Sequence, residues 1–201
     1  KTSKAPKING KPFGGVWESA SWVGNPVYLN EKKITSKLDM DVGLLWDERA
    51  LYVGFRVYQH REPKAITRTR GDDGLERDDS VEVMLWVPGF NTKSSRKIIR
   101  KGGRVVQFKL NCEGLRDDAI HFDFSWDAEW EGAVSQNEEK NEWYATFSIP
   151  FKNFGIYPTT GDRWGANFAA FLVGYHYRGF LWAPVSLRHH HQGQFGVIEF
   201  G

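Results

Sequence analysis

The segment Ser80-Val-Glu-Val-Met-Leu-Trp-Val87 decides the fold class, because its side chains alternate strictly between apolar and mixed types. In a β-strand successive side chains point to opposite sides. One side of this strand carries only apolar residues, Val81, Val83, Leu85 and Val87. The other side carries Ser80, Glu82, Met84 and Trp86. Such a pattern predicts a strand with one face turned toward a hydrophobic core.

The same two-residue period recurs along the chain. We expect further strands near residues 26–30, 38–46, 51–58, 105–112, 120–124, 130–136, 143–149, 165–174, 179–183 and 195–200. Helical signals are confined to single turns near 16–20 and 150–154. Many short strands without long helices between them predict an all-β fold, a two-sheet antiparallel β-sandwich of immunoglobulin-like or jelly-roll-like type.

Length and composition limit the possible classes of protein. The 201 residues fit one domain, 1–201, and the sequence lacks the run of about 20 apolar residues that a membrane helix needs. A net charge of +2 does not predict a nucleic-acid partner. The lone Cys112 excludes an intramolecular disulfide and is expected to be a small buried residue. The sequence begins at Lys1 without an apolar signal segment, so the residues themselves do not show its targeting.

The charges are unevenly distributed. Residues 93–109 carry seven basic and no acidic side chains, whereas residues 113–131 carry seven acidic side chains and only Arg116 as a basic one. One interpretation is a solvated hairpin tip beside an acidic loop. The other is a contact surface for an anionic glycan.

Candidate binding residues follow from the chemistry of sugar recognition. Aromatic rings stack on the apolar faces of pyranose rings, and polar side chains form paired hydrogen bonds with neighbouring hydroxyls. We expect polar and aromatic side chains to share one outer sheet face: Arg56, Tyr58, Glu82, Trp86, Lys109 and Asn111. Trp182 is a further stacking candidate, although core packing is the ordinary role of a tryptophan.

Two clusters suggest metal sites. Asp72, Asp73 and Asp78 could provide the oxygen ligands of a structural calcium ion, although acidic loops are often simply solvated. The three histidines 189–191 do not converge in an extended chain, so we expect loop residues there, with His189 or His190 a glycan contact. The sequence has no nucleophile elbow, phosphate-binding glycine loop or zinc-protease motif, which favours a non-catalytic protein.

Several segments together resemble family 9 carbohydrate-binding modules. In order along the chain they are Ile8-Asn-Gly-Lys11 with Val16-Trp-Glu-Ser-Ala20, Leu45-Trp-Asp-Glu-Arg-Ala-Leu-Tyr-Val53, Asp78-Asp-Ser-Val-Glu-Val83, Gln107-Phe-Lys-Leu-Asn111, Trp143 to Pro150, Gly161-Asp-Arg-Trp-Gly-Ala-Asn-Phe168, Trp182-Ala-Pro184 and Gln194-Phe-Gly196. The resemblance implies a secreted, periplasmic or cell-surface β-sandwich that binds a polysaccharide or oligosaccharide. It also implies fusion to, or action beside, a glycoside hydrolase, and a structural calcium.

In that family a sugar lies between two tryptophans. The resemblance places its polar contacts at Glu82, Lys109 and Asn111. The two stacking tryptophans correspond to Glu76 and to a position near His189, so the resemblance does not imply specificity for glucose or cellobiose.

Three alternatives stay open at this point. Related sandwiches bind haem for electron transfer, and Met40, Met84 or lysine or histidine residues could then be axial ligands. The chain could also be a glycan-active enzyme or the accessory domain of one. Finally, it could be a structural sandwich that has lost ligand binding, because a shared fold does not guarantee a shared site.

Overall fold

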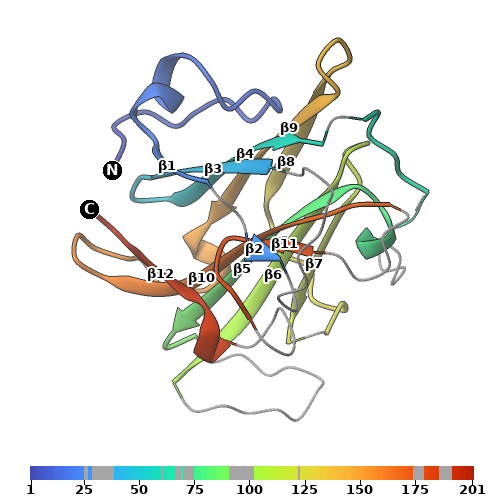
Figure 1. Ribbon diagram of the computed structural model, residues 1–201. Coiled ribbons are helices and arrows are strands. Elements are labelled where there is room, and N and C mark those ends of the chain that lie inside the picture. The colour runs from blue at the N-terminus through green and yellow to red at the C-terminus, as the bar shows by residue number, and fades with distance from the viewer. Residues whose placement is uncertain are drawn as a thin grey trace.

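The protein is an all-β sandwich of two antiparallel sheets, seen in a computed structural model (Figure 1). The structure describes residues 1–24, 27–28, 39–59, 61–66, 69, 75–90, 102–121, 123–173, 179–185 and 192–201. The predicted fold class is confirmed.

The first sheet has the order β1-β3-β4-β9-β8. Its strands are β1 (Ser21–Val23), β3 (Asp39–Trp46), β4 (Ala50–Tyr58), β8 (Glu131–Asn137) and β9 (Glu142–Pro150). The β3–β4 and β8–β9 pairs are hairpins, and β4 pairs with β9 over its whole length, from Ala50 opposite Pro150 to Tyr58 opposite Glu142.

The second sheet has the order β2-β11-β10-β5-β6-β7, and β12 also pairs with β10. Its strands are β2 (Val27–Tyr28), β5 (Ser80–Pro88), β6 (Gly103–Asn111), β7 (Arg116–Ile120), β10 (Arg163–Phe171), β11 (Gly179–Leu181) and β12 (Gly196–Glu199). Single 3-10 turns complete the elements: η1 (Gly15–Ser19), η2 (Leu75–Arg77), η3 (Phe151–Asn153) and η4 (Gln192–Gln194).

The main core fills the space between the two sheets, as the alternation predicts. From the first sheet it takes residues such as Val53, Phe55 and Phe147, and from the second sheet Phe108 and Phe168, all completely buried. Burying one such side chain is worth about 1.5–3 kcal/mol. Cys112 belongs to the same core, with 1% of its surface exposed, which confirms the sequence interpretation.

The N-terminal segment covers the outer face of the first sheet. Trp17 packs there against Leu45 and Tyr52. The backbone N–H of Gly10 donates to Thr146 Oγ1 at 2.9 Å. This face of the first sheet is therefore partly occupied by the chain's own N-terminal residues.

Sequence and structure differ mainly at β7 and β1. The strand expected near 120–124 spans Arg116–Ile120 instead, and β1 was not predicted. Strand β7 is hard to recognise in the sequence because it contains two adjacent acidic residues, Asp117 and Asp118, which are typical of exposed loops. In the structure both side chains are buried. The single turns expected near 16–20 and 150–154 are confirmed as η1 and η3.

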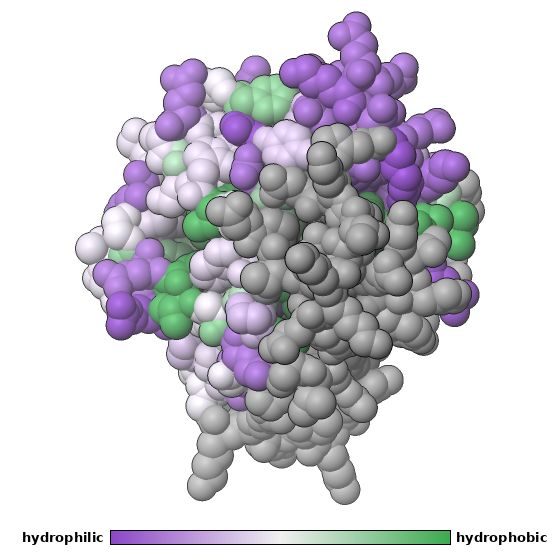
Figure 2. Space-filling model, viewed as in Figure 1, coloured by the Kyte–Doolittle hydropathy of each residue, from purple (hydrophilic) through white to green (hydrophobic). Residues whose placement is uncertain are grey.

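Few large apolar side chains are exposed among the described residues. They are Phe13, Ile66, Tyr157 and Val197. On the face seen in Figure 2, hydrophobic residues are isolated among hydrophilic ones. Single exposed apolar residues are normal for a folded protein and indicate no docking surface. None of the helices among the described residues has the length and apolar character needed to span a membrane.

Candidate functional site

The outer face of the second sheet, the side away from the main core, carries the predicted polar residues. On β5 and β6 the inward positions hold core residues such as Val83 and Phe108. The outward positions hold Ser80, Glu82, Met84 and Trp86 on β5, and Val105, Gln107, Lys109 and Asn111 on β6. The strand pairing sorts these side chains into rows that run across the sheet.

One row, which we call the charged row, consists of Glu82, Lys109 and Asp117. Lys109 on β6 lies directly opposite Glu82 on β5 and directly opposite Asp117 on β7. Directly opposed side chains have Cβ atoms about 4.5–5.5 Å apart, so Lys109 has an acidic residue beside it on each neighbouring strand. The exposed fractions are 0% for Glu82, 6% for Lys109 and 2% for Asp117. Charges buried to this extent persist only with compensating partners, and these three compensate one another in part.

The row next to it is centred on Gln107. This residue lies opposite Met84 on β5 and Ala119 on β7, and it is 2% exposed. Among the residues that the structure describes, neither Oε1 nor Nε2 of Gln107 has a hydrogen-bond partner. Asn167, which continues the row on β10, is fully paired: its Nδ2 donates to Ala183 O and its Oδ1 accepts from Ala183 N.

Trp86 forms the next row and is half-buried. It lies opposite Gly165 on β10 and Val105 on β6. A Cβ atom built on Gly103 would lie 2.9 Å from Cε2 and Cζ2 of the indole, and one on Gly165 would lie 3.0 Å from Trp86 Cβ. The two glycines therefore leave the space in which the indole ring lies along the sheet. Because Trp86 is opposite Val105, it is the diagonal neighbour of Gln107 on the same face.

An apolar cluster borders these rows on the β10–β11 side. It contains Met84, Ala169, Phe171, Leu181 and Val185, with Phe195 packed against it. Ala169 and Leu181 extend the charged row across the sheet. The polar rows thus lie between an apolar border and the β7 edge, an arrangement typical of ligand sites that combine a few polar groups with apolar walls.

Asn111 has a structural part in this face. Its Nδ2 donates to Asp78 Oδ2 at 2.9 Å, and its Oδ1 accepts from the backbone N–H of Glu113 and of Leu115. These bonds hold the turn between β6 and β7. Asn111 therefore uses most of its hydrogen bonds to hold this turn, and the turn keeps Lys109 and Asp117 in register.

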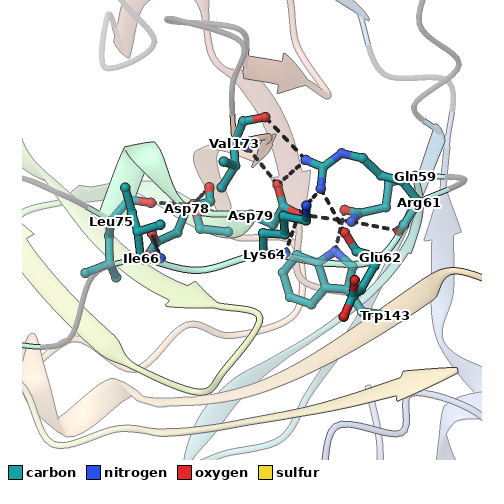
Figure 3. A network of polar contacts seen from close by, with 11 residues as sticks. Gln59, Arg61, Glu62, Lys64, Ile66, Leu75, Asp78, Asp79, Trp143 and Val173 are labelled. Atoms are coloured by element: carbon teal, nitrogen blue, oxygen red, sulfur yellow. Dashed lines mark hydrogen bonds and ion pairs between the residues drawn. The ribbon is translucent and has the colours of Figure 1, made fainter. Parts of the chain in front are cut away.

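Asp78 and Asp79 anchor the chain at the start of β5 (Figure 3). Asp78 Oδ1 accepts from Ile66 N at 2.7 Å. Asp79 is completely buried and accepts five hydrogen bonds, from Gln59 Nε2, Arg61 Nη1, Arg61 Nη2, Lys64 N and Val173 N. Trp143 Nε1 in turn donates to Gln59 Oε1. This network joins both sheets and positions the strand that carries Glu82.

The calcium prediction stays a prediction. Asp72 and Asp73 lie outside the described residues. Asp78 is described, and its two oxygens accept the hydrogen bonds given above. Within the described part of the chain, no three His, Cys, Asp or Glu side chains are grouped so that they could hold a metal ion.

Arg56 and Tyr58 do not lie on the candidate site, so the expected shared surface is wrong in this respect. Both are on β4 of the first sheet, on its outer face. The Arg56 guanidinium carbon lies 3.8 Å from the centre of the Trp22 ring, and Nη2 donates to Pro12 O. Alternation gives the phase of each strand, but β4 and β5 belong to different sheets, whose outer faces lie on opposite sides of the molecule.

Tyr58 is engaged locally on that opposite face. Its hydroxyl donates to Asp41 Oδ2 at 2.9 Å. Partial burial and this hydrogen bond raise the pKa of the Tyr58 phenol to about 12. The phenol therefore stays protonated at neutral pH and acts as a hydrogen-bond donor to the carboxylate.

Trp182 packs toward the main core rather than onto the candidate site. Its ring lies 5.5 Å from that of Phe168, a core residue, and a Cβ on Gly196 would lie 2.3 Å from its Cζ3. The aromatic candidate on the site face is therefore Trp86. His189 and the basic residues between 93 and 101 lie outside the described residues.

The two methionines considered as haem ligands lie in different parts of the molecule. Met40 is in the main core between the sheets, whereas Met84 is in the apolar cluster on the outer face of the second sheet. The sheet itself separates them, so they do not form one axial pair.

Gln107 and Asp117 belong to the rows of the candidate site, but the sequence interpretation did not include them. Gln107 has the same strand phase as Lys109, and this phase was its only signal in the sequence. Asp117 lies in the acidic stretch interpreted as a solvated loop. Its position beside Lys109 depends on the β6–β7 pairing, which alternation within one strand does not specify.

Comparisons with solved structures identify the class of fold. Residues covering 98% of this chain superpose on a family 9 carbohydrate-binding module of Caldicellulosiruptor kristjanssonii solved with cellotriose, at a TM-score of 0.65, 17% identity and 89% coverage of that chain. The module of the same organism solved with glucose gives a TM-score of 0.67 at 17% identity, with 98% and 91% coverage. A Bacteroides uniformis protein provisionally described as carbohydrate-binding gives 0.64 and 17%, with 92% and 88% coverage.

The protein thus has the fold of a family 9-like carbohydrate-binding β-sandwich, as the resemblance implies. No protein-family model matches the sequence, and no curated protein matches it either.

Proposed function

We propose that the protein is a non-catalytic carbohydrate-binding domain whose site is the outer face of β5, β6 and β7. The observation that carries the proposal is the charged row: Glu82, Lys109 and Asp117 lie in register on the side of the sheet away from the main core, and all three are buried. An outward sheet face needs no buried charges for folding. A function explains why they are there.

The chemistry of the row suits hydroxylated ligands. A lysine ammonium offers three donors, and a carboxylate offers only acceptors, so neighbouring residues present both kinds of partner to vicinal hydroxyls. Hydrogen bonds that involve an ionised group are stronger than neutral ones, particularly away from water. The partly exposed Trp86 adds a ring on which the apolar face of a sugar can stack.

The geometry favours binding over hydrolysis. A glycosidase places its two carboxyl groups on either side of the scissile bond. Glu82 and Asp117 project from the same sheet face, in one line, with Lys109 between them. They flank a cation instead of facing each other across a substrate. The fold neighbours described as carbohydrate-binding modules support the same assignment.

We place the protein outside the cytoplasm, secreted, periplasmic or at the cell surface, where it would serve a glycoside hydrolase fused to it or acting beside it. The ligand is a polysaccharide or oligosaccharide. A structural calcium near Asp72, Asp73 and Asp78 belongs to the same proposal, with a stabilising role apart from the sugar site.

Affinity electrophoresis against a panel of soluble polysaccharides, with and without calcium, tests the function. Glu82→Gln and Lys109→Met each remove one charge of the row and keep the length of the side chain. Each variant should weaken binding about 10- to 100-fold, because hydrogen bonds to charged groups contribute about 1.5–3 kcal/mol.

The matched control is Tyr157→Ala, which removes an exposed aromatic ring outside the site. It should bind as wild type does, and circular dichroism should show that all variants are folded. Binding to none of the polysaccharides, or equal binding by wild type and both charge variants, would refute the proposed function.

A further inference from the structure

The N-terminal segment contains the only Asn-Gly pair of the sequence, Asn9-Gly10. It lies against the outer face of the first sheet, on the opposite side of the sandwich from the proposed site. An asparagine followed by glycine is prone to deamidation, because glycine has no Cβ atom to keep its backbone nitrogen away from the asparagine side chain. The side chain of Asn9 is exposed, so water reaches the amide that would react.

Deamidation of this pair needs no reactant other than water. The backbone nitrogen of Gly10 gives its proton to hydroxide and bonds to Cγ of Asn9, the bond between Cγ and Nδ2 breaks, and ammonia leaves. Water then opens the resulting five-membered imide at one of its two carbonyl groups. The product is an aspartate, or an isoaspartate whose main chain runs through the β-carbon, and no electron is transferred.

The structure holds the attacking nitrogen in a position where it cannot react. The backbone N–H of Gly10 donates to Oγ1 of Thr146 at 2.9 Å, and Thr146 is completely buried. The carbonyl oxygen of Gly10 accepts from Ser135 Oγ at 2.6 Å, so the peptide groups on both sides of this residue are bonded to the sheet. While these bonds persist, the nitrogen keeps its proton, is shielded from hydroxide and cannot move toward Cγ of Asn9.

The local geometry explains why this reactive pair is present at all. Gly10 has a φ of +73°, and a Cβ atom there would lie 2.2 Å from the carbonyl carbon of Val134, so the position requires glycine. Asn9 Oδ1 accepts from the backbone N–H of Lys11 at 3.2 Å, a local bond for which an asparagine side chain is well suited. Both residues thus have structural roles, and their reactivity accompanies these roles.

We infer that Asn9 is a site of spontaneous deamidation, that it reacts only in molecules whose N-terminal segment has left the sheet, and that Thr146 is the residue that suppresses the reaction. An isoaspartate adds one atom to the main chain beside Gly10, and the close contact of Gly10 with β8 has no room for it. The modified segment therefore does not return to its original position, so the reaction records each undocking irreversibly. The inference is independent of the proposed function.

Two variants of one residue test the inference. Thr146→Val keeps the shape of the side chain but removes the acceptor, whereas Thr146→Ser keeps the acceptor. Peptide mass spectrometry after incubation at mildly alkaline pH measures how fast Asn9 is converted. Thr146→Val should react about 5- to 150-fold faster than wild type, the factor by which a buried donor left without an acceptor favours undocking, and Thr146→Ser should stay close to wild type.

The inference is overturned if Thr146→Val reacts no faster than wild type, if Thr146→Ser reacts as fast as Thr146→Val, or if folded wild type reacts as fast as wild type unfolded in urea. Hydrogen exchange separates local undocking from global unfolding. In Thr146→Val, exchange of the Gly10 amide should rise by about the same factor as deamidation, while exchange of the Val83 amide on β5 should not change. An equal rise at Val83 would show that the whole protein opens, and the role of Thr146 would then be refuted.

Discussion

Replacing Asp79 with asparagine should destabilise the protein far more than its small change in shape suggests. The carboxylate is completely buried and accepts five hydrogen bonds, two at Oδ1 and three at Oδ2. An asparagine keeps only one oxygen. Whichever way the amide is turned, its Nδ2 faces at least two donors, and the Arg61 guanidinium loses its counter-charge. Breaking a buried charge pair in this way costs about 3–5 kcal/mol.

Urea denaturation at pH 7, followed by tryptophan fluorescence, measures this cost as a change in the free energy of unfolding. The control is Glu199→Gln, which breaks the ion pair between Arg163 Nε and Glu199 Oε2 at 2.8 Å. That pair is of similar length but largely exposed, and such pairs contribute about 0–1 kcal/mol. If Asp79→Asn costs no more than Glu199→Gln, then the network in Figure 3 does not hold the two sheets together as argued.

Three further predictions concern other parts of the molecule. Gly10→Ala should lose much more stability than Gly14→Ala in the same denaturation assay. Both glycines have positive φ, but a Cβ atom at position 10 would lie 2.2 Å from the carbonyl carbon of Val134, whereas position 14 has open space. Equal losses of stability would contradict this prediction. Burial raises the pKa of the Cys112 thiol to about 12, so iodoacetamide at pH 8 should modify only unfolded protein. Stability should also fall as pH rises from about 9 toward 12, because in this range the thiol ionises in the unfolded protein but not in the folded one. If calcium binds near Asp78, a chelator should lower the melting temperature, and an unchanged melting curve would remove calcium from the proposal.

The sequence was sufficient for the fold class because strand phase is a local property. The alternation on β5 and β6 specifies which residues face the core, and Val83, Leu85 and Phe108 are buried there as expected. The same alternation correctly placed Glu82 and Lys109 on one face. These inferences need only the two-residue period and a single hydrophobic core.

Which residues share the candidate site depends on which strands are neighbours, and the alternation within one strand does not show this. Arg56 and Glu82 have the same kind of outward position, but they belong to strands of different sheets. Asp117 could be recognised beside Lys109 only once β7 was known to pair with β6. Which strands are neighbours is decided by packing over the whole domain, so a single sequence without related sequences gives no direct signal of it.

The two faces of the second sheet show why a similar fold does not imply the same ligand. The inner face is apolar, completely buried and shared in its architecture with proteins at 17% identity, so it specifies the sandwich without specifying a ligand. The outer face holds a row of buried charges, and taking charges out of water costs free energy even where they are paired. Groups that reduce stability are retained where function selects them. Lys109→Met should lower both stability and binding, because it leaves the buried carboxylates of Glu82 and Asp117 without the cation between them, whereas variants of Phe108, the preceding residue on the same strand, should change stability alone.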